Sequence, residues 1–348
     1  MSRSVVAAMT AYTLELREAE VKLNQNESPF DLPREIKEEV LARVTERPWN
    51  IYPDFECLAL RQALANAYYL TADQILVGNG SNELLAATIG AFVGPGTPVV
   101  FSKPTFTLYE KLVTIAGGLP IPVEIQPESG FLPIEGMLAS LNRVTSHPEH
   151  AVVIVCSPNN PTGGVLPAGG LEQLLATGAV VLFDRAYGDF ANQELPPLHD
   201  RLVTFSTFSK AWGLAALRVG WLASTAANCR EIRKVKLPYS LNIISEAIAE
   251  TALAHRELRD RNVAHTIAER ERIAGVMRSM SGITPYPSQA NFIAFRLRRN
   301  AKDVFEELCT RGFLIRDISS TVPNSLRVSI GTTEQNDCFL EALHESIR

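Results

Sequence analysis

Short apolar runs alternate with segments of helical composition through the middle of the chain. Three of these runs, each rich in Val, Ile and Leu, begin near residues 151, 179 and 202. Strands that are buried on both faces of a parallel sheet have this composition. The intervals between the runs fit strand–helix–strand units, so the pattern predicts an α/β domain with a mostly parallel sheet.

The pattern changes beyond Pro238. In residues 246–277, apolar positions recur at intervals of three and four, and many of the other positions are charged, which is typical of helices with one solvated face. Alternating segments at residues 291–298 and 325–331 predict strands, and residues 302–312 between them predict a helix. This order of elements predicts a second, smaller α+β domain.

Composition limits the class of protein. The chain has 348 residues, of which 46% are hydrophobic, and this is enough for one large and one smaller domain. A net charge of −5 with scattered basic residues argues against nucleic acid as a partner. Nowhere do 18 apolar residues run together, and the N-terminal apolar run is too short for a secretion signal, so we expect a cytoplasmic protein with no membrane partner. Five widely spaced cysteines without a C-x-x-C pair fit a reducing compartment and predict no metal site.

Polar side chains follow the three buried runs. Asn160 comes after the first run, Asp184 ends the second and Lys210 follows the third. In open α/β sheets, ligands bind outside the carboxyl ends of the strands. We therefore expect these three side chains to converge on one crevice.

Lys210 lies between Ser209 and an apolar Ala-Trp-Gly segment. In a dry pocket the neutral form of a lysine amine is favoured, and this amine is a nucleophile that combines with an aldehyde such as pyridoxal phosphate. That cofactor needs a carboxylate against its ring nitrogen, and Asp184 directly follows four apolar residues. A surface loop for Lys210 and a helix N-cap for Asp184 are the alternative interpretations.

The remaining parts of such a cofactor also find candidate partners. Two glycines in ILVGNGSNELL predict a tight turn that points the backbone amides of Ser81 and Asn82 at a phosphate. Phe106 can stack on the ring, with ordinary core packing as its alternative. Hydrogen bonds to the phosphate can come from Thr207, Ser209 and Arg218. Hydrogen bonds to the phenolic oxygen of the ring can come from Asn160 and Tyr187.

Eight segments in fixed order resemble the motifs of the fold-type-I pyridoxal-phosphate aminotransferases of classes I and II, with the histidinol-phosphate aminotransferase family the most similar. They are KLNQNESPF, NIYPD, GNGSNE, KPTFTLY, SPNNPTG, FDRAY, SKAWGLAALRVG and LRVSIG. The resemblance covers about residues 20 to 345. It implies a large domain with a mostly parallel seven-stranded sheet and a small α+β domain. We expect an N-terminal arm at residues 1–20, a large domain at residues 45–245, and a small domain that combines residues 21–44 with residues 246–348.

The resemblance also implies roles for single residues. Lys210 binds the cofactor covalently, Asp184 pairs with the pyridine nitrogen, and Asn160 and Tyr187 hold the phenolic oxygen. Phe106 stacks on the ring, and the phosphate is held by Ser81, Asn82, Thr207, Ser209 and Arg218. Tyr52 reaches the phosphate bound by the neighbouring subunit, which implies a homodimer.

The expected substrates follow from the same resemblance. Arg327 grips the substrate carboxylate, Arg316 is aimed at a substrate phosphate, and Asn26 belongs to the same substrate site. The implied reaction is transamination between histidinol phosphate and 2-oxoglutarate; the alternatives are an aromatic or broad-range aminotransferase, a lyase like threonine-phosphate decarboxylase, and a sensor that binds the cofactor without catalysis. Two residues depart from the family pattern: Arg185 stands where glutamate is usual, and Phe106 where many members carry tyrosine.

Overall fold

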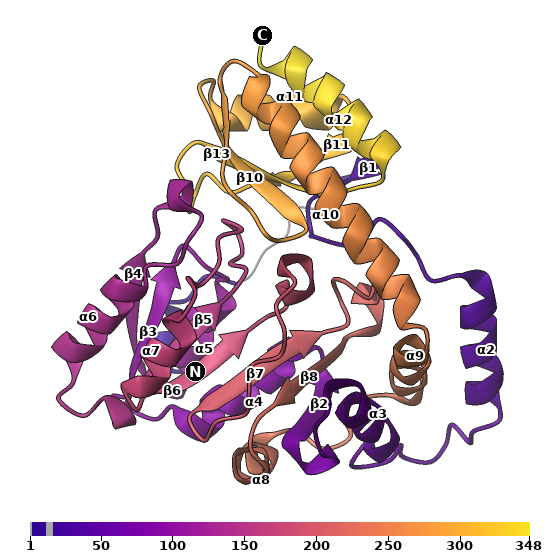
Figure 1. Cartoon of the computed structure of the whole chain (residues 1–348), viewed down its shortest axis with the longest axis vertical. Coiled ribbons are helices and arrows are strands. Elements are labelled where there is room, and N and C mark those ends of the chain that lie inside the picture. Colours follow the sequence, from indigo (N-terminus) through magenta and orange to yellow (C-terminus); the bar gives the residue numbers. More distant parts are fainter. Residues whose placement is uncertain (1, 12–16) are drawn as a thin grey trace.

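A seven-stranded sheet forms the centre of the larger part of the molecule in the computed structural model, which describes residues 2–11 and 17–348 (Figure 1). The strand order is β2-β8-β7-β6-β5-β3-β4; β8 is antiparallel to both of its neighbours, β2 and β7, and the other adjacent pairs are parallel. The strands are β2 (Ile75–Asn79), β3 (Pro98–Lys103), β4 (Leu119–Glu124), β5 (Val152–Cys156), β6 (Val180–Asp184), β7 (Leu202–Thr207) and β8 (Val219–Ala223). The mostly parallel sheet is therefore confirmed, and β5, β6 and β7 begin within one residue of the predicted positions.

The connection from β7 to β8 explains the single antiparallel strand. Residues 208–218 join the two strands directly, without the long crossover that a parallel pair requires. They contain only the short 3-10 helix η5 (Ala215–Leu217). The loop that carries Lys210 therefore turns back at the carboxyl end of β7.

Helices cover both faces of this sheet because its central strands are apolar on both sides. On one face, Leu76 and Leu222 pack with α4 (Ser81–Phe92), α5 (Leu108–Ala116) and α8 (Ala226–Val235). On the other face, Val77 and Trp221 pack with α3 (Leu58–Tyr68) and α9 (Ile243–Ala254), and the opposite end of that face is covered by α6 (Ile134–Val144) and α7 (Gly170–Ala176).

A smaller antiparallel sheet lies beside the large one, with the order β12-β13-β10-β9. Its strands are β9 (Ile283–Pro285), β10 (Phe292–Leu297), β12 (Arg316–Asp317) and β13 (Ser325–Ser329). Helices α10 (Arg256–Ser279), α11 (Ala301–Thr310) and α12 (Thr333–Ser346) share one hydrophobic cluster with Leu326 and Val328 of β13. Arg327, between these two residues, therefore points to the opposite face of the small sheet.

Short elements complete the described chain. A two-stranded parallel sheet joins β1 (Val21–Lys22) to β11 (Phe313–Leu314), so the segment after residue 20 is tied to the small sheet's side of the molecule. The other 3-10 helices are η1 (Ala72–Gln74), η2 (Pro127–Ser129), η3 (Pro148–His150) and η4 (Gly188–Ala191). Within residues 2–11 and 17–348, the helices are too short or too polar to cross a membrane.

The structure contains two helices, α9 and α10, where the sequence pattern predicts one helical stretch. The helical stretch predicted over residues 246–277 is divided at His255, whose backbone (φ −110°, ψ 49°) is not helical. The resulting α9 shares one hydrophobic cluster with α2 (Arg34–Thr45), α3 and the large sheet. The division into domains remains a proposal, and this packing favours placing α2 and α9 in the larger domain.

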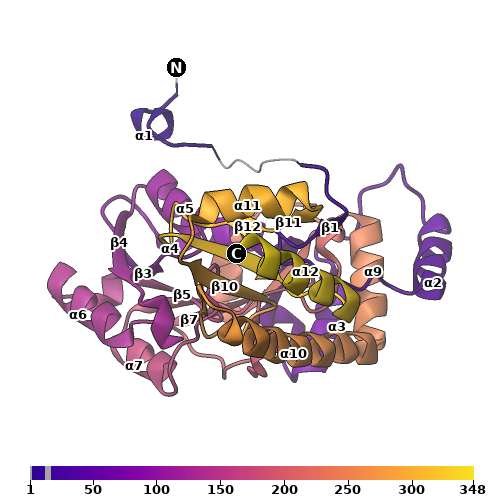
Figure 2. The ribbon, with the colours of Figure 1, turned by 90° about the horizontal axis from the view of Figure 1, so that it is seen from above.

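The predicted N-terminal arm lies partly outside the described residues, because Met1 and residues 12–16 are not among them. The described part includes α1 (Ser4–Ala7), which lies at the edge of the molecule (Figure 2). Arg3 Nη1 donates a hydrogen bond to the carbonyl of Ile115 at 3.3 Å, and Lys111 Nζ donates to the carbonyl of Thr10 at 2.7 Å. These contacts place residues 3–10 against α5.

Candidate active site

A cleft opens at the carboxyl ends of β5, β6 and β7. It consists of two adjoining cavities of about 360 Å³ and about 320 Å³, which share Gln25, Phe106, Asn160, Tyr187 and Lys210. The first cavity brings together every residue predicted to hold the cofactor within one subunit: Ser81, Asn82, Phe106, Asn160, Asp184, Tyr187, Thr207, Ser209, Lys210 and Arg218. The second contains the three predicted substrate residues, Asn26, Arg316 and Arg327.

Lys210 projects into the cleft from the loop after β7. Its Nζ donates a hydrogen bond to the carbonyl of Gln25 at 2.9 Å and lies 5.7 Å from the ring centre of Tyr187. Burial of the amine, helped by the positive charges of Arg327 and Arg218, lowers the pKa of Lys210 from 10.5 to about 7. A large share of the amine is therefore uncharged near neutral pH, as a nucleophile requires.

Asp184 stands at the end of β6 and is only 8% exposed. Its Oδ1 accepts a hydrogen bond from the backbone N–H of Ala186 at 2.9 Å, and its Oδ2 accepts one from the hydroxyl of Tyr109 at 2.7 Å. Burial raises the pKa of Asp184, while these two hydrogen bonds lower it. The carboxylate thus accepts two hydrogen bonds but forms no salt bridge within the described chain. It can therefore pair with a cationic group that binds in the cleft.

The cleft has donors for an anion next to Lys210. Arg218 Nη1 donates to Ser209 Oγ at 3.3 Å, and Thr207 Oγ1 lies 3.0 Å from the same oxygen. Ser81 and Asn82 form the first turn of α4, where the backbone N–H groups have no partner within the helix. This combination of a helix N-terminus, hydroxyls and a guanidinium is suited to a phosphate group.

Two glycines allow these groups to approach one another. A Cβ on Gly80, whose φ is +75°, would lie 2.5 Å from Arg218 Nη2. A Cβ on Gly220 would lie 2.1 Å from the backbone nitrogen of Ser81. Arg218 itself has a left-handed backbone (φ 55°), a conformation that non-glycine residues rarely adopt and that often marks functional sites.

Asn26 links the two parts of the molecule across the cleft. Its Nδ2 donates to the hydroxyl of Tyr187 at 2.9 Å, and its backbone nitrogen donates to Ser329 Oγ of β13 at 2.8 Å. Burial raises the pKa of Tyr187 to about 12, against the opposing effect of Arg327. Tyr187 therefore keeps its proton near neutral pH and can donate it in a hydrogen bond.

Arg327, on the small sheet, contacts Asn160 in the loop after β5. Its Nη1 donates to Asn160 Oδ1 at 2.5 Å, its Nη2 donates to the carbonyl of Asn24 at 2.9 Å, and its guanidinium lies 5.1 Å from the ring centre of Phe292. Since the amide oxygen of Asn160 faces Arg327, its Nδ2 is the group left to bind a phenolic oxygen. Arg316 lines the same cavity from the neighbouring strand.

Phe106 lines the cleft, whereas Tyr52 and Arg185 do not. Phe106 lies in both cavities and meets the ring of Tyr109 edge to face at 5.6 Å. Tyr52 is outside the cleft of its own chain: it is 78% exposed and stacks on Tyr239 at 4.7 Å. Arg185 points away from the cleft, because its Nη1 and Nη2 donate to Ser206 Oγ at 3.0 Å and to the carbonyl of Gln193 at 2.6 Å. The departure at Arg185 therefore leaves the cofactor residues untouched.

Tyr109 is a residue of the site that the sequence did not predict. It is 1% exposed, lines the first cavity and bonds Asp184 directly. The residue ends the KPTFTLY segment, three residues after Phe106. A tyrosine on the apolar face of a helix signals a hydroxyl that needs a buried partner, but the sequence does not indicate which one, since Asp184 is 75 residues away.

The donor set fits pyridoxal phosphate part by part. The lowered pKa of Lys210 suits an aldehyde, and the buried carboxylate of Asp184 suits a protonated ring nitrogen. The cradle beside Arg218 suits the phosphate, and Phe106 provides a ring face. Each group of the cofactor thus has a partner of the matching chemistry.

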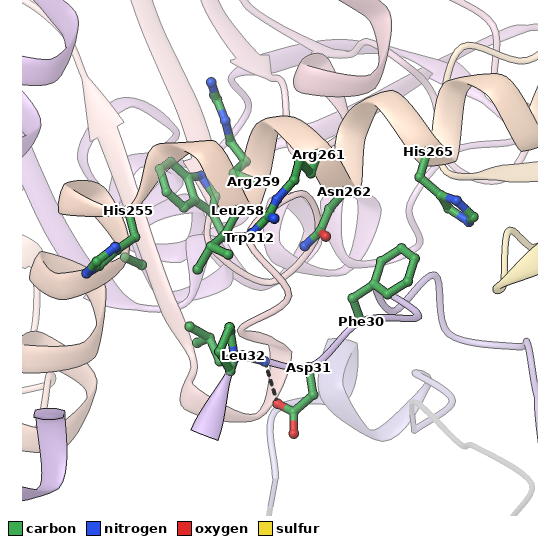
Figure 3. Close-up of a pocket in the computed structure, with 12 residues that line it drawn as sticks. Phe30, Asp31, Leu32, Trp212, His255, Leu258, Arg259, Arg261, Asn262 and His265 are labelled. Atoms are coloured by element: carbon green, nitrogen blue, oxygen red, sulfur yellow. Dashed lines mark hydrogen bonds between the residues drawn. The ribbon is translucent and has the colours of Figure 1, made fainter. Parts of the chain in front are cut away.

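Another cavity of similar size, about 370 Å³, lies between the segment after Phe30 and the beginning of α10 (Figure 3). Trp212, two residues after Lys210, forms part of its wall. The guanidinium of Arg259 points away from it and pairs with Asp189 at 3.2 Å and Asp260 at 2.5 Å. Among the residues around this cavity there is no lysine, serine or cysteine that could act as a nucleophile. It is therefore not a candidate for the reaction.

Comparison with known proteins extends these observations. Residues 18–343 match the family model described as aminotransferase class I and II. The chain is 30% identical to a histidinol-phosphate aminotransferase of Ruminiclostridium cellulolyticum (98% of this chain, 97% of the relative) and 35% identical to one of Chlorobium phaeobacteroides (96% and 94%). It also resembles the crystal structure of histidinol-phosphate aminotransferase from Sinorhizobium meliloti in complex with pyridoxal-5'-phosphate, with a TM-score of 0.87, 25% identity, and coverage of 99% of this chain and 97% of that one.

Proposed function

Because this chain belongs to the class I and II aminotransferase family, we propose that it transfers the amino group of histidinol phosphate to 2-oxoglutarate. It is a pyridoxal-phosphate-dependent enzyme, as its family and its structural relative indicate. The observation that carries the choice of substrate is the pairing of Arg316 and Arg327 in one cavity with Lys210. Two guanidinium groups within reach of the reacting amine favour substrates that bear strongly anionic groups.

Lys210, Asp184 and Arg327 each have a separate role in the proposed reaction. Pyridoxal phosphate supplies an aldehyde that captures the substrate amine and a ring that accepts electrons. Lys210, with its lowered pKa, would bind the aldehyde until the substrate amine replaces it, and its freed amine would then take up and return the proton of the substrate Cα. Asp184 would pair with the protonated ring nitrogen, and Arg327 would orient the substrate so that its Cα–H bond faces Lys210.

The resemblance also supports a cytoplasmic homodimer, in which Tyr52 of one subunit reaches the phosphate held by the other. Exposed apolar side chains in and near the segment of this tyrosine support the assembly, since exposed apolar surface often marks contacts between proteins. They include Trp49, Ile51, Tyr52, Phe55, Leu58 and Leu237. Histidine biosynthesis is the proposed pathway because the relatives carry the name of an enzyme of that pathway.

A spectral titration tests the proposed function. The purified chain with pyridoxal phosphate should show a visible absorption band that histidinol phosphate bleaches, and Lys210→Ala should lack this band. Rates with histidinol phosphate, phenylalanine and aspartate then separate the proposed substrate from those of an aromatic or broad-range aminotransferase. Release of carbon dioxide in place of an oxo product would instead identify a decarboxylase, and a band that no amine alters would identify a sensor.

A further inference from the structure

We infer that Tyr109 is a positioning residue for Asp184, which holds this carboxylate in its ionised form and fixes its direction. The inference rests on the proposed cofactor and concerns a residue to which neither the family resemblance nor the motif pattern gave a role.

The geometry of the pair is specific. The hydroxyl of Tyr109, on α5, donates to Asp184 Oδ2 at 2.7 Å, a length typical of a strong hydrogen bond to a charged oxygen. The backbone N–H of Ala186 donates to Oδ1 at 2.9 Å. Since both oxygens are held from different directions, the carboxyl plane cannot rotate without losing one of these bonds.

The surroundings explain why such support is needed. Asp184 is 8% exposed and Tyr109 is 1% exposed, so only a small part of the carboxylate is accessible to water. The guanidinium of the adjacent Arg185 points to Ser206 and Gln193 and does not compensate it. Burial alone would favour the neutral acid, and the Tyr109 hydrogen bond acts in the opposite direction on the pKa of Asp184.

The phenol can act only as a donor in this pair. Burial and the neighbouring carboxylate raise the pKa of Tyr109 well above its usual value, so it stays protonated near neutral pH. The thiol of Cys156, in register with Asp184 on the adjacent strand, has a pKa raised to about 12 and adds no charge. Asp184 is therefore the one carboxyl group among these three buried side chains, and neither neighbour brings a charge of its own.

The consequence lies at the ring nitrogen of the cofactor. A carboxylate that stays ionised and points into the cleft keeps a ring nitrogen protonated; a neutral or rotated acid does not. Removal of the Tyr109 hydroxyl should raise the pKa of Asp184 and weaken the part of cofactor binding that depends on the ring nitrogen.

The test compares Tyr109→Phe, which removes one oxygen atom, with Tyr286→Phe as a matched control. Tyr286 is also buried, and its hydroxyl contacts Ser325 Oγ at 3.1 Å, outside both cavities of the cleft. Dissociation constants are measured by spectral titration for pyridoxal phosphate and for its 1-deaza analogue, in which carbon replaces the ring nitrogen. Thermal unfolding of the unliganded variants reports whether they fold.

The expected result is a loss of roughly tenfold in the affinity of Tyr109→Phe for pyridoxal phosphate, with little change for the 1-deaza analogue and little change for Tyr286→Phe with either ligand. The affinity of Tyr109→Phe should also begin to fall at a higher pH than that of the wild type, because Asp184 then takes up a proton more easily. Equal losses for both ligands, or no loss, would overturn the inference.

A double variant tests whether the loss in Tyr109→Phe runs through Asp184 or reflects a general loss of structure. If Tyr109 acts through Asp184, then adding Tyr109→Phe to Asp184→Asn causes no further loss of cofactor affinity; independent effects would contradict the inference. Failure of the wild-type chain to bind pyridoxal phosphate at all would be a different outcome, since it would overturn the proposed function itself.

Discussion

Arg316 and Arg327 are directly opposite each other on the antiparallel strands β12 and β13. Cross-strand partners project their side chains to the same face of a sheet, and like charges in this position destabilise it. Both side chains line the second cavity of the cleft, where Arg327 is only 7% exposed. The arrangement places two like charges on one face of the sheet, and an anion bound in this cavity would offset the repulsion between them.

Substitution of the two arginines should have different effects. Arg327→Lys should lower kcat/KM for every amine substrate by about 10- to 100-fold, because lysine cannot reproduce the fork that holds an anion. Arg316→Met should lower kcat/KM for histidinol phosphate to a similar degree but change that for alanine by less than about threefold, since alanine has a single carboxylate. Steady-state kinetics of both variants with both amines measure this. An equal loss for Arg316→Met with the two amines would exclude a phosphate-specific role.

The pKa of Lys210 can be tested in the protein without its cofactor. Competitive labelling with acetic anhydride over a pH series should give a midpoint near 7 for Lys210, in place of the usual value of about 10.4 for lysine. Arg327→Met should move this midpoint upward, because the charge of Arg327 is the largest electrostatic contribution after burial. A midpoint above about 10 would contradict the buried, partly neutral amine.

The same shift sets the sign of one contribution to stability. Between pH 7 and pH 10.5 the unfolded chain holds a proton on Lys210 that the folded chain has released, so the free energy of unfolding gains a term that rises with pH in this window. Lys210→Met should lack this term. The measurement is urea unfolding of both proteins at pH 7 and pH 9.5, and an identical pH dependence for both would contradict the shift.

Gly220 should not tolerate a methyl group. Gly220→Ala places a Cβ against the backbone nitrogen of Ser81, so β8 or the beginning of α4 must move. We expect a loss of about 1–3 kcal/mol in the free energy of unfolding and weaker binding of pyridoxal phosphate. Gly94→Ala is the matched control, because a Cβ there meets no atom within 4 Å. Similar unfolding curves for the two variants would show that the start of α4 is not constrained in this way.

The sequence predicts much of this site because several of its residues lie at the carboxyl ends of strands that have a clear sequence pattern. The apolar runs before Asn160, Asp184 and Lys210 predict parallel strands, and parallel strands bring their carboxyl ends together whatever the rest of the fold does. The pairing of Tyr109 with Asp184 could not be predicted, because it depends on how α5 docks on the sheet. The packing of α9 against α2 and the large sheet was missed for a similar reason: periodicity identifies an apolar face but does not identify the surface that covers it.

Arg185 offers a test of one departure from the family pattern. Its buried guanidinium bonds Ser206 and Gln193 and lies 3.9 Å from Asp189. Arg185→Glu, which restores the residue usual in the family, should lower the free energy of unfolding by about 3–5 kcal/mol, because it buries a second carboxylate beside Asp189. Urea unfolding measures the loss, with Arg185→Met as a control that should lose less. A variant as stable as the wild type would show that the surroundings of Arg185 can rearrange.

The proposed exchange of Tyr52 between subunits leads to a complementation test. Tyr52→Ala should bind pyridoxal phosphate about tenfold more weakly, and Lys210→Ala should be inactive. In a mixed dimer of these two variants, the subunit with native Lys210 receives native Tyr52 from its partner, so activity at low cofactor concentration should exceed that of Tyr52→Ala alone. The control mixes Tyr52→Ala with the double variant Lys210→Ala/Tyr52→Ala, which supplies no native tyrosine and should give no gain. If Tyr52 served the site of its own chain, neither mixture would recover, because the subunit with native Lys210 would lack its tyrosine in both; recovery in the first mixture alone therefore requires a dimer whose sites are completed across the interface.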